Sequence, residues 1–273
     1  MNQIWDPGAK SPPIKITLSG IARALPRAIV LVTVVFGGLA LMLFLRLGER
    51  PFFGQRRPIT PFITVAVCRV AFFVLGIKHR CIGETMQHPG ALVANHVSWL
   101  DIFALNARKQ IYFVSKSEVA DWPGIGALAR ATGTMFIRRS PNEAKREIEI
   151  FEERLLAGHQ LMFFPEGTST DGLRILRFKS TLFAAFFTDA LRPSMYIQPV
   201  TLIYHPPVGK PAYFYGWWGD MSFFSHLLET LMAPRQGAVD VRYHPPLKVD
   251  AYIDRKALAA DAENIVRAGA ELG

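Results

Sequence analysis

A histidine and an aspartate five residues apart are the side chains whose types and spacing most directly suggest catalysis. They are His96 and Asp101, in the stretch NHVSWLD at residues 95–101. A histidine titrates near neutral pH and can act as a general base, while a neighbouring carboxylate can orient its ring. No serine or cysteine motif accompanies the pair as a nucleophile. We therefore expect an enzyme whose nucleophile belongs to the substrate.

This pairing requires the chain to turn between the two residues, because side chains five apart on an ideal helix point in different directions. Ser98 and Asp101 have the spacing of a capping box, which predicts that a helix begins near Trp99. His96 would then lie just before the helix and Asp101 in its first turn. The alternative is that Asp101 only caps the helix and His96 only ends a strand.

A second motif, FPEGT at residues 164–168, ends a predicted strand with a tight turn and the carboxylate of Glu166. On its own this motif is also consistent with a plain strand-to-loop turn. Active sites of α/β proteins lie at the carboxyl ends of strands. Two such motifs at strand ends, in one chain that also has an apolar N-terminal run, are much less likely to arise by chance, which favours a catalytic role for the histidine and the aspartate.

The elements that must position these motifs are predicted from the apolar pattern. Short runs rich in β-branched and aromatic residues indicate buried strands, at residues 91–94, 111–114, 134–137, 161–164 and 197–204. Helices are predicted at residues 141–157, 179–191 and 254–272, the first with a capping box from Ser140 and Glu143 and with Pro141 at its first position. The alternation predicts an α/β fold with a largely parallel central sheet flanked by helices.

The N-terminal part is apolar enough to enter a membrane. Residues 28–45 carry no charge, and a span needs about 17–25 apolar residues. We expect an uncleaved anchor rather than a signal peptide, because the preceding region is long and the only small-residue triplet lies inside the run. Residues 61–77, interrupted by Arg69, fit an interfacial or re-entrant helix, with a buried core helix as the alternative. Basic residues flank both ends of residues 28–45, so charge leaves the orientation open.

The composition agrees with a membrane protein. Half of the residues are hydrophobic and the net charge is +9, which suits an anionic membrane surface or nucleic acid. The apolar run and the lack of a nucleic-acid-binding motif favour the membrane. Cys68 and Cys81 have neither metal-ligand nor disulfide spacing, so we expect no metal site. The expected organisation is a tail at residues 1–25, a membrane anchor with an interfacial helix at 26–80, and a catalytic domain at 81–273.

Four short blocks in the right order resemble the glycerolipid acyltransferase family, whose type member acylates lysophosphatidate to phosphatidate. The blocks N-H-x4-D and F-P-E-G-T-R-S are matched at residues 95–101 and 164–168. The block G-x-I-F-I-x-R is matched at residues 133–139, with Met135 in place of isoleucine, and a strand containing a proline is matched at residues 198–200. The resemblance covers residues 80–205.

The resemblance implies a membrane-bound O-acyltransferase that moves an acyl group from an acyl-carrier-protein or coenzyme A thioester to the hydroxyl of a lysolipid, without a cofactor. His96 would be the general base and Asp101 its orienting carboxylate. The residues expected to bind substrate are Asn95, Lys116, Arg138, Arg139, Glu166, Gly167, Thr168 and Lys179. Family analogy also implies an active site on the cytoplasmic face of the cell inner membrane.

One departure from the family pattern concerns the acceptor. Ser169 stands where the third block has an arginine that the family associates with the acceptor phosphate. Serine cannot bind phosphate bidentately as arginine does. Arg139, Arg177 and Lys179 could compensate, which keeps 1-acylglycerol-3-phosphate as the first expectation. A lyso-ornithine lipid is the alternative acceptor.

Two other classes of function stay open from the sequence. A membrane-associated thioesterase or lipid hydrolase would use the same dyad to activate water. A non-catalytic lipid-binding protein would not need His96. The aromatic segment at residues 213–221 suggests either contact with the membrane interface or core packing, and its role is unassigned.

Overall fold

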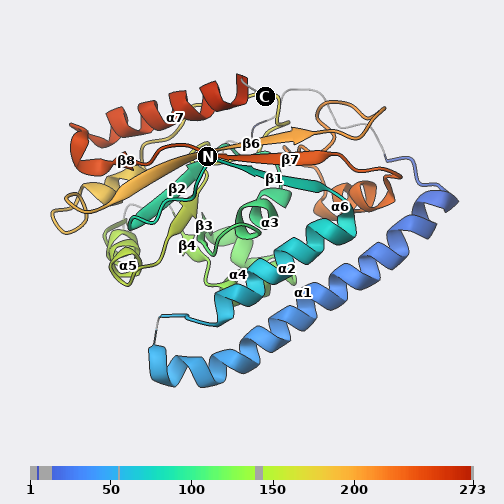
Figure 1. Ribbon diagram of the computed structural model, residues 1–273, viewed down its shortest axis with the longest axis horizontal. Coiled ribbons are helices and arrows are strands. Elements are labelled where there is room, and N and C mark those ends of the chain that lie inside the picture. Colours follow the sequence, from blue (N-terminus) through green and yellow to red (C-terminus); the bar gives the residue numbers. More distant parts are fainter. Residues whose placement is uncertain (1–4, 6–13, 55, 139–143, 272–273) are drawn as a thin grey trace.

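The structure, a computed structural model, describes residues 5, 14–54, 56–138 and 144–271. Figure 1 shows a central sheet with helices on both faces and two N-terminal helices along one side. The strands are β1 (Lys78–Ile82), β2 (Gly90–Ala94), β3 (Tyr112–Lys116), β4 (Met135–Ile137), β5 (Leu161–Phe163), β6 (Tyr196–His205), β7 (Ala238–Tyr243) and β8 (Leu247–Lys248). The α-helices are α1 (Leu18–Phe53), α2 (Thr60–Leu75), α3 (Leu100–Asn106), α4 (Ile125–Thr132), α5 (Ala144–Leu156), α6 (Phe223–Met232) and α7 (Arg255–Glu271). Short 3₁₀ helices are η1 (Ser117–Asp121), η2 (Leu182–Phe187) and η3 (Val249–Ala251).

The sheet has the strand order β1-β7-β6-β2-β5-β3-β4, with β8 added beside β6. Strands β7 and β8 run antiparallel to β6, and the other pairings are parallel. The predicted largely parallel α/β sheet is therefore confirmed. The sequence pattern missed β1, β7 and β8. Strand β1 is a half-exposed edge strand of mostly polar residues, and Asp and Arg interrupt the apolar run of β7, so neither resembles a buried strand.

The two faces of the sheet belong to different cores, because side chains alternate along each strand. In β2, Leu92 and Ala94 face a core that includes residues of α2, α3 and α6. Ala91 and Val93 face the opposite core, built with α5, η2 and α7. Burial on both faces explains why β2 is a continuous apolar run rather than an alternating one.

The predicted C-terminal helix is confirmed as α7, and the helix predicted at 141–157 is present as α5. Its proposed cap, Ser140 with Pro141 and Glu143, lies outside the described residues. The helix predicted at 179–191 is wrong in type, because only the short 3₁₀ helix η2 forms there. Its buried Phe183 and Phe186 are three residues apart, which matches the period of a 3₁₀ helix.

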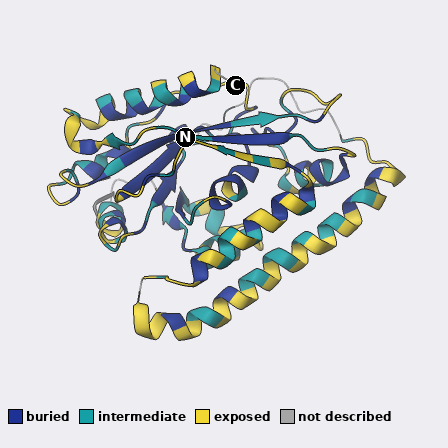
Figure 2. Cartoon of the chain, in the orientation of Figure 1, coloured by how far each residue is buried: buried dark blue, intermediate teal, exposed yellow. Residues whose placement is uncertain are grey.

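Helices α1 and α2 form an antiparallel hairpin that packs beside the α/β part of the chain (Figure 1). They come close at Gly38, where an added Cβ would lie 2.5 Å from Val67 Cγ2. Helix α1 is the one helix among the described residues that is long and apolar enough to cross a membrane. Figure 2 shows that much of its surface is exposed.

Helix α2 has one buried face and one exposed apolar face. Cys68 and Phe72 are buried against the domain, whereas Phe62 and Phe73 are exposed. Arg69, the charge that interrupts this apolar stretch, donates from Nε to the carbonyl of Ala107 at the C-terminus of α3. The arginine therefore serves the contact between α2 and the domain. One face of α2 belongs to the core, and a place for its exposed apolar face at the membrane interface stays a prediction.

Candidate active site

Strands β2 and β5 lie side by side and end together. Val93 pairs with Phe163 in the parallel register, so both sequence motifs leave the sheet at the same edge. The residues after β2 and those after β5 therefore meet, as expected for a site at the carboxyl ends of parallel strands.

His96 and Asp101 are in direct contact. His96 Nδ1 lies 2.8 Å from Asp101 Oδ2, and the Asp101 side chain is fully buried. The carboxylate can only accept, so the ring donates its Nδ1–H and keeps Nε2 unprotonated in the neutral form. This tautomer is the one that a general base needs.

One half of the predicted capping box forms in the turn between the two residues. Asp101 Oδ2 accepts the backbone N–H of Ser98 at 3.0 Å, but Ser98 Oγ accepts the N–H of Leu100 at 3.3 Å rather than that of Asp101, which donates to the Ser98 carbonyl. Helix α3 begins at Leu100, next to the predicted start. The same carboxylate oxygen accepts the N–H of Val97 at 2.8 Å, which fixes its position relative to the histidine.

Tyr204, on β6, completes the environment of Asp101 and was not found by sequence reasoning. Its hydroxyl donates to Asp101 Oδ1 at 2.8 Å. Burial, together with the nearby Asp101 charge, raises the pKa of Tyr204 well above its ordinary value, so the phenol stays protonated and keeps donating. Nothing near Tyr204 in the sequence marks this contact, because the two residues are far apart along the chain.

His96 is also held by the second motif. Its ring stacks on Phe164, with centroids 3.9 Å apart. Its carbonyl accepts the backbone N–H of Thr170 at 3.0 Å, and its own N–H donates to Glu166 Oε1 at 2.6 Å. The two motifs thus form one unit around the histidine, although 70 residues separate His96 from Glu166.

Glu166 is buried and orders the loops at the edge of the sheet. Its second oxygen accepts the N–H of Leu176 at 2.7 Å. Burial raises the pKa of Glu166 to about 8, against the lowering effect of the two backbone N–H donors. Both of its oxygens therefore accept hydrogen bonds from the backbone, and they do not face the space where a substrate would bind.

The raised pKa of Glu166 predicts a pH-dependent stability. The folded protein holds this proton at pH values where the unfolded chain, with an ordinary pKa near 4.5, has released it. Stability should therefore fall as pH rises from about 4.5 to about 8. Glu166→Gln does not titrate, so the melting temperature of the wild type minus that of the variant should decrease over this range. Thermal unfolding of both proteins in detergent measures this difference, and a constant or increasing difference would refute the prediction.

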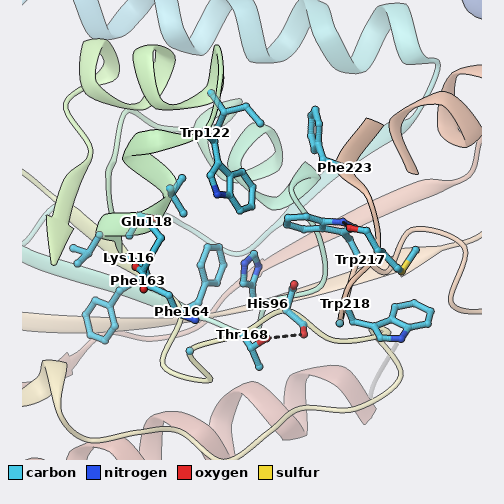
Figure 3. A pocket seen from close by; sticks show the side chains of 18 of the residues that line it. His96, Lys116, Glu118, Trp122, Phe163, Phe164, Thr168, Trp217, Trp218 and Phe223 are labelled. Carbon is cyan, nitrogen blue, oxygen red and sulfur yellow. Dashed lines mark hydrogen bonds between the residues drawn. The ribbon is translucent and has the colours of Figure 1, made fainter. Parts of the chain in front are cut away.

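His96 faces a cavity of about 610 Å³. Figure 3 shows the His96 ring between Phe164 and Trp217, near Trp122 and Phe223. The walls are mainly aromatic and aliphatic, and they come from the ends of the parallel strands, the η1–α4 region and residues 217–224. Such a cavity suits an apolar chain with a reactive polar group placed beside the histidine.

The structure brings some of the other predicted site residues to this cavity and leaves others elsewhere. Lys116, Gly167 and Thr168 line it. Arg138 and Lys179 are exposed and do not line it. Arg139 lies outside the described residues.

Asn95 does not line the cavity either, because its side chain bridges two strands. Its Nδ2 donates to the carbonyl of Leu202 at 2.9 Å, and its Oδ1 accepts the Leu202 N–H at 2.8 Å. This contact fixes the end of β2 against β6. Asn95 and Glu166 therefore support the site through backbone contacts, rather than lining the space for a ligand.

The aromatic segment that the sequence left unassigned forms a wall of the cavity. Trp217 and Trp218 line the cavity, and the backbone N–H of Trp217 donates to the carbonyl of Val97 at 2.9 Å. The segment is thereby fixed to the loop that follows His96. The density of aromatic residues was the only feature of the sequence that marked this segment. Neither of the two expectations, membrane contact or core packing, included a place beside the histidine.

Comparisons with known proteins agree with this geometry. A family model described as Acyltransferase matches residues 78–203. The lyso-ornithine lipid O-acyltransferase of Rhodobacter capsulatus is 54% identical to this chain, over 97% of this chain and 96% of its own length. The chain belongs to the glycerolipid acyltransferase family.

Two further proteins similar to this acyltransferase match it less completely or only in fold. The 1-acyl-sn-glycerol-3-phosphate acyltransferase of Neisseria gonorrhoeae is 40% identical over 45% of this chain and 48% of its own length. The crystal structure of the 1-acyl-sn-glycerophosphate acyltransferase from Thermotoga maritima has a TM-score of 0.64 at 20% identity, covering 93% of this chain and 97% of that chain. The protein is an acyltransferase that acts on lysolipids.

Proposed function

We propose that this acyltransferase is a lyso-ornithine lipid O-acyltransferase, rather than the lysophosphatidate acyltransferase first expected from its motifs. The observation that carries the proposal is the near end-to-end similarity to the Rhodobacter capsulatus enzyme. The similarity to the Neisseria gonorrhoeae lysophosphatidate enzyme spans less than half of either chain. The acceptor would then be a 3-hydroxyacyl chain in amide linkage to ornithine.

The charges of the cavity support this choice of acceptor. Among the described residues that line it, the carboxylates are Glu118 and Asp220, and Lys116 is the only cation apart from the titratable His96. Ser169 also lines the cavity, at the position where the family has an arginine. A phosphate monoester would meet an excess of negative charge in a partly apolar cavity, where charge repulsion is stronger than in water.

The proposed mechanism uses the dyad directly. His96 Nε2 removes the proton of the acceptor 3-hydroxyl while that oxygen attacks the thioester carbonyl carbon. The buried Asp101 carboxylate stabilises the imidazolium that forms. The tetrahedral intermediate then collapses, the carbon–sulfur bond breaks, and the imidazolium returns its proton to the leaving thiolate. The products are the ester and the free thiol of coenzyme A or acyl carrier protein.

The tetrahedral intermediate carries an oxyanion that needs hydrogen-bond donors. The backbone N–H groups of Val97 and Ser98 donate to Asp101, and those of Leu100 and Asp101 donate to Ser98. The backbone N–H groups of Thr168 and Ser169 donate to no acceptor among the described residues, and both residues line the cavity with His96. We propose these two groups as the oxyanion donors, in line with the role of such groups in acyl transfer.

The membrane supplies the lipid substrate in this proposal. Helix α1 lies near the cavity wall, because a Cβ added at Gly124, between the lining residues Pro123 and Ile125, would lie 3.9 Å from Phe36 Cζ. Arg23 and Arg27 of α1 donate to backbone carbonyls at the C-terminus of α6, which ties the apolar helix to the domain. We place helices α1 and α2 at the inner membrane and the acyltransferase domain on its cytoplasmic side, where thioester donors are made. The domain begins at Lys78 rather than at the expected residue 81, because β1 (Lys78–Ile82) pairs with β7 in its sheet.

Ser169→Arg tests the head-group assignment. Arginine at this position restores a bidentate phosphate donor, so we expect the ratio of lysophosphatidate to lyso-ornithine lipid acylation to rise about tenfold or more. The measurement is kcat/KM for each acceptor with the purified full chain in detergent. Ser194→Arg, which adds the same side chain at an exposed serine outside the described lining of the cavity, is the control and should leave the ratio unchanged. An unchanged ratio in Ser169→Arg would remove Ser169 from the argument.

Omission of the acceptor separates a transferase from a hydrolase. A transferase should lose acyl thioester slowly without a lysolipid and quickly once the lysolipid is added, with the label recovered in a diacylated lipid. Equal thioester loss in both conditions, with the label in free fatty acid, would assign the dyad to hydrolysis.

A further inference from the structure

One wall of the cavity presents a carboxylate among indole rings. Trp217, Trp218 and Asp220 all line the cavity. Asp220 is exposed there, and its side chain forms no hydrogen bond or ion pair with any residue in the described part of the chain. The proposed chemistry at His96 gives this carboxylate no role.

The turn that carries Asp220 is fixed at several points. Trp217 Nε1 donates to the carbonyl of Met221 at 2.8 Å, and the Met221 N–H donates to the carbonyl of Trp218 at 3.2 Å. Gly219, between them, has a φ of 61°, a conformation that glycine adopts readily. The backbone N–H of Trp217 also donates to the carbonyl of Val97, in the loop after His96. The place of Asp220 is therefore set relative to the catalytic dyad.

The chemistry of this wall suits a cation. The faces of indole rings attract ammonium groups, and a carboxylate beside them adds a charge-assisted hydrogen bond. The residues that line the cavity also include more carboxylates than lysine or arginine side chains, and this negative charge likewise favours a cation. The acceptor that we propose carries a matching group, because its ornithine side chain ends in a primary ammonium that acylation does not consume.

We propose that Asp220, with Trp217 and Trp218 beside it, binds the side-chain ammonium of the ornithine head group and thereby selects a cationic lysolipid over a phosphate-bearing one. This inference rests on the proposed function and names the part of the site that reads the head group. It makes Asp220 a specificity residue that touches the substrate away from the reacting hydroxyl.

The test compares two acceptors that differ only at the ammonium. N-(3-hydroxyacyl)ornithine and N-(3-hydroxyacyl)norvaline share the reacting hydroxyl and the carboxylate, but norvaline lacks the amine. The wild type should prefer the ornithine acceptor, and Asp220→Asn should reduce the ratio of the two kcat/KM values roughly 10- to 100-fold. Asp189→Asn, an exposed aspartate outside the cavity, should leave the ratio unchanged.

A charge swap gives a second readout that does not depend on loss of activity. Asp220→Lys should favour N-(3-hydroxyacyl)glutamate, whose side chain is anionic, over the ornithine acceptor. An Asp220→Asn ratio equal to that of the wild type, or a swap variant that still prefers ornithine, would overturn the role of Asp220 alone. A wild type that acylates lysophosphatidate and neither amino-acid lipid would instead overturn the proposed function.

Discussion

Replacement of His96 by alanine is expected to lower kcat by about 10² to 10⁴, the contribution typical of a positioned general base. The ring lies 2.8 Å from Asp101, stacks on Phe164 and faces the cavity. The lysolipid hydroxyl would lose its proton acceptor, while the cavity that binds the acyl chains would remain. KM for the lysolipid should therefore change much less than kcat. Steady-state kinetics of the purified full chain in detergent measure both.

The matched control for this variant is His88→Ala. His88 is an exposed histidine outside the cavity, stacked on Tyr196, and its loss should leave kcat within about twofold because such surface changes are mostly small. Circular dichroism and the melting temperature check that His96→Ala still folds. If a folded His96→Ala enzyme keeps wild-type turnover, His96 is not the base.

The second large effect is expected for Asp101→Asn, which should lower kcat by roughly 10³ to 10⁴, as for the equivalent change in a serine-protease triad. The amide oxygen of asparagine can still accept from Val97 and Ser98. Its NH₂ group can donate to the hydroxyl oxygen of Tyr204, which donates to Asp101 in the wild type and would accept in the variant. The fold should therefore survive, but the buried negative charge that stabilises the imidazolium of His96 is lost.

Tyr204→Phe separates the charge of Asp101 from its hydrogen bonds. This variant keeps the carboxylate and removes one of its donors, so kcat should fall by about tenfold or less. Kinetics of the two variants at several pH values distinguish these roles. A loss in Tyr204→Phe as large as that in Asp101→Asn would mean that the placement of Asp101, rather than its charge, controls turnover.

The dyad and the strands that present it were predictable, because the information is local. The spacing of His96, Ser98 and Asp101 specifies a turn followed by a capped helix, and the apolar runs before His96 and Glu166 have the composition of buried parallel strands. Contacts between neighbouring strand ends then follow from the carboxyl-edge rule.

The parts of the site that escaped prediction depend on long-range contacts. Tyr204 reaches Asp101 because β6 lies beside β2, and no local pattern contains that register. Glu166 was expected at the substrate, but its two oxygens hold the backbone of His96 and Leu176. The tryptophan-rich segment joins the cavity through one backbone bond, from Trp217 to Val97. The motifs predicted the contact between His96 and Asp101, but not the side chains that line the space around it.

The central claim, acyl transfer to a lyso-ornithine lipid, is tested most directly by a competition assay. Purified full-chain enzyme in detergent receives labelled acyl thioester together with equal amounts of lyso-ornithine lipid and lysophosphatidate, and the labelled products are separated by chromatography. The account predicts that the label appears mainly in ornithine lipid, and that His96→Ala removes it. Label found mainly in phosphatidate, or only in free fatty acid, would contradict it.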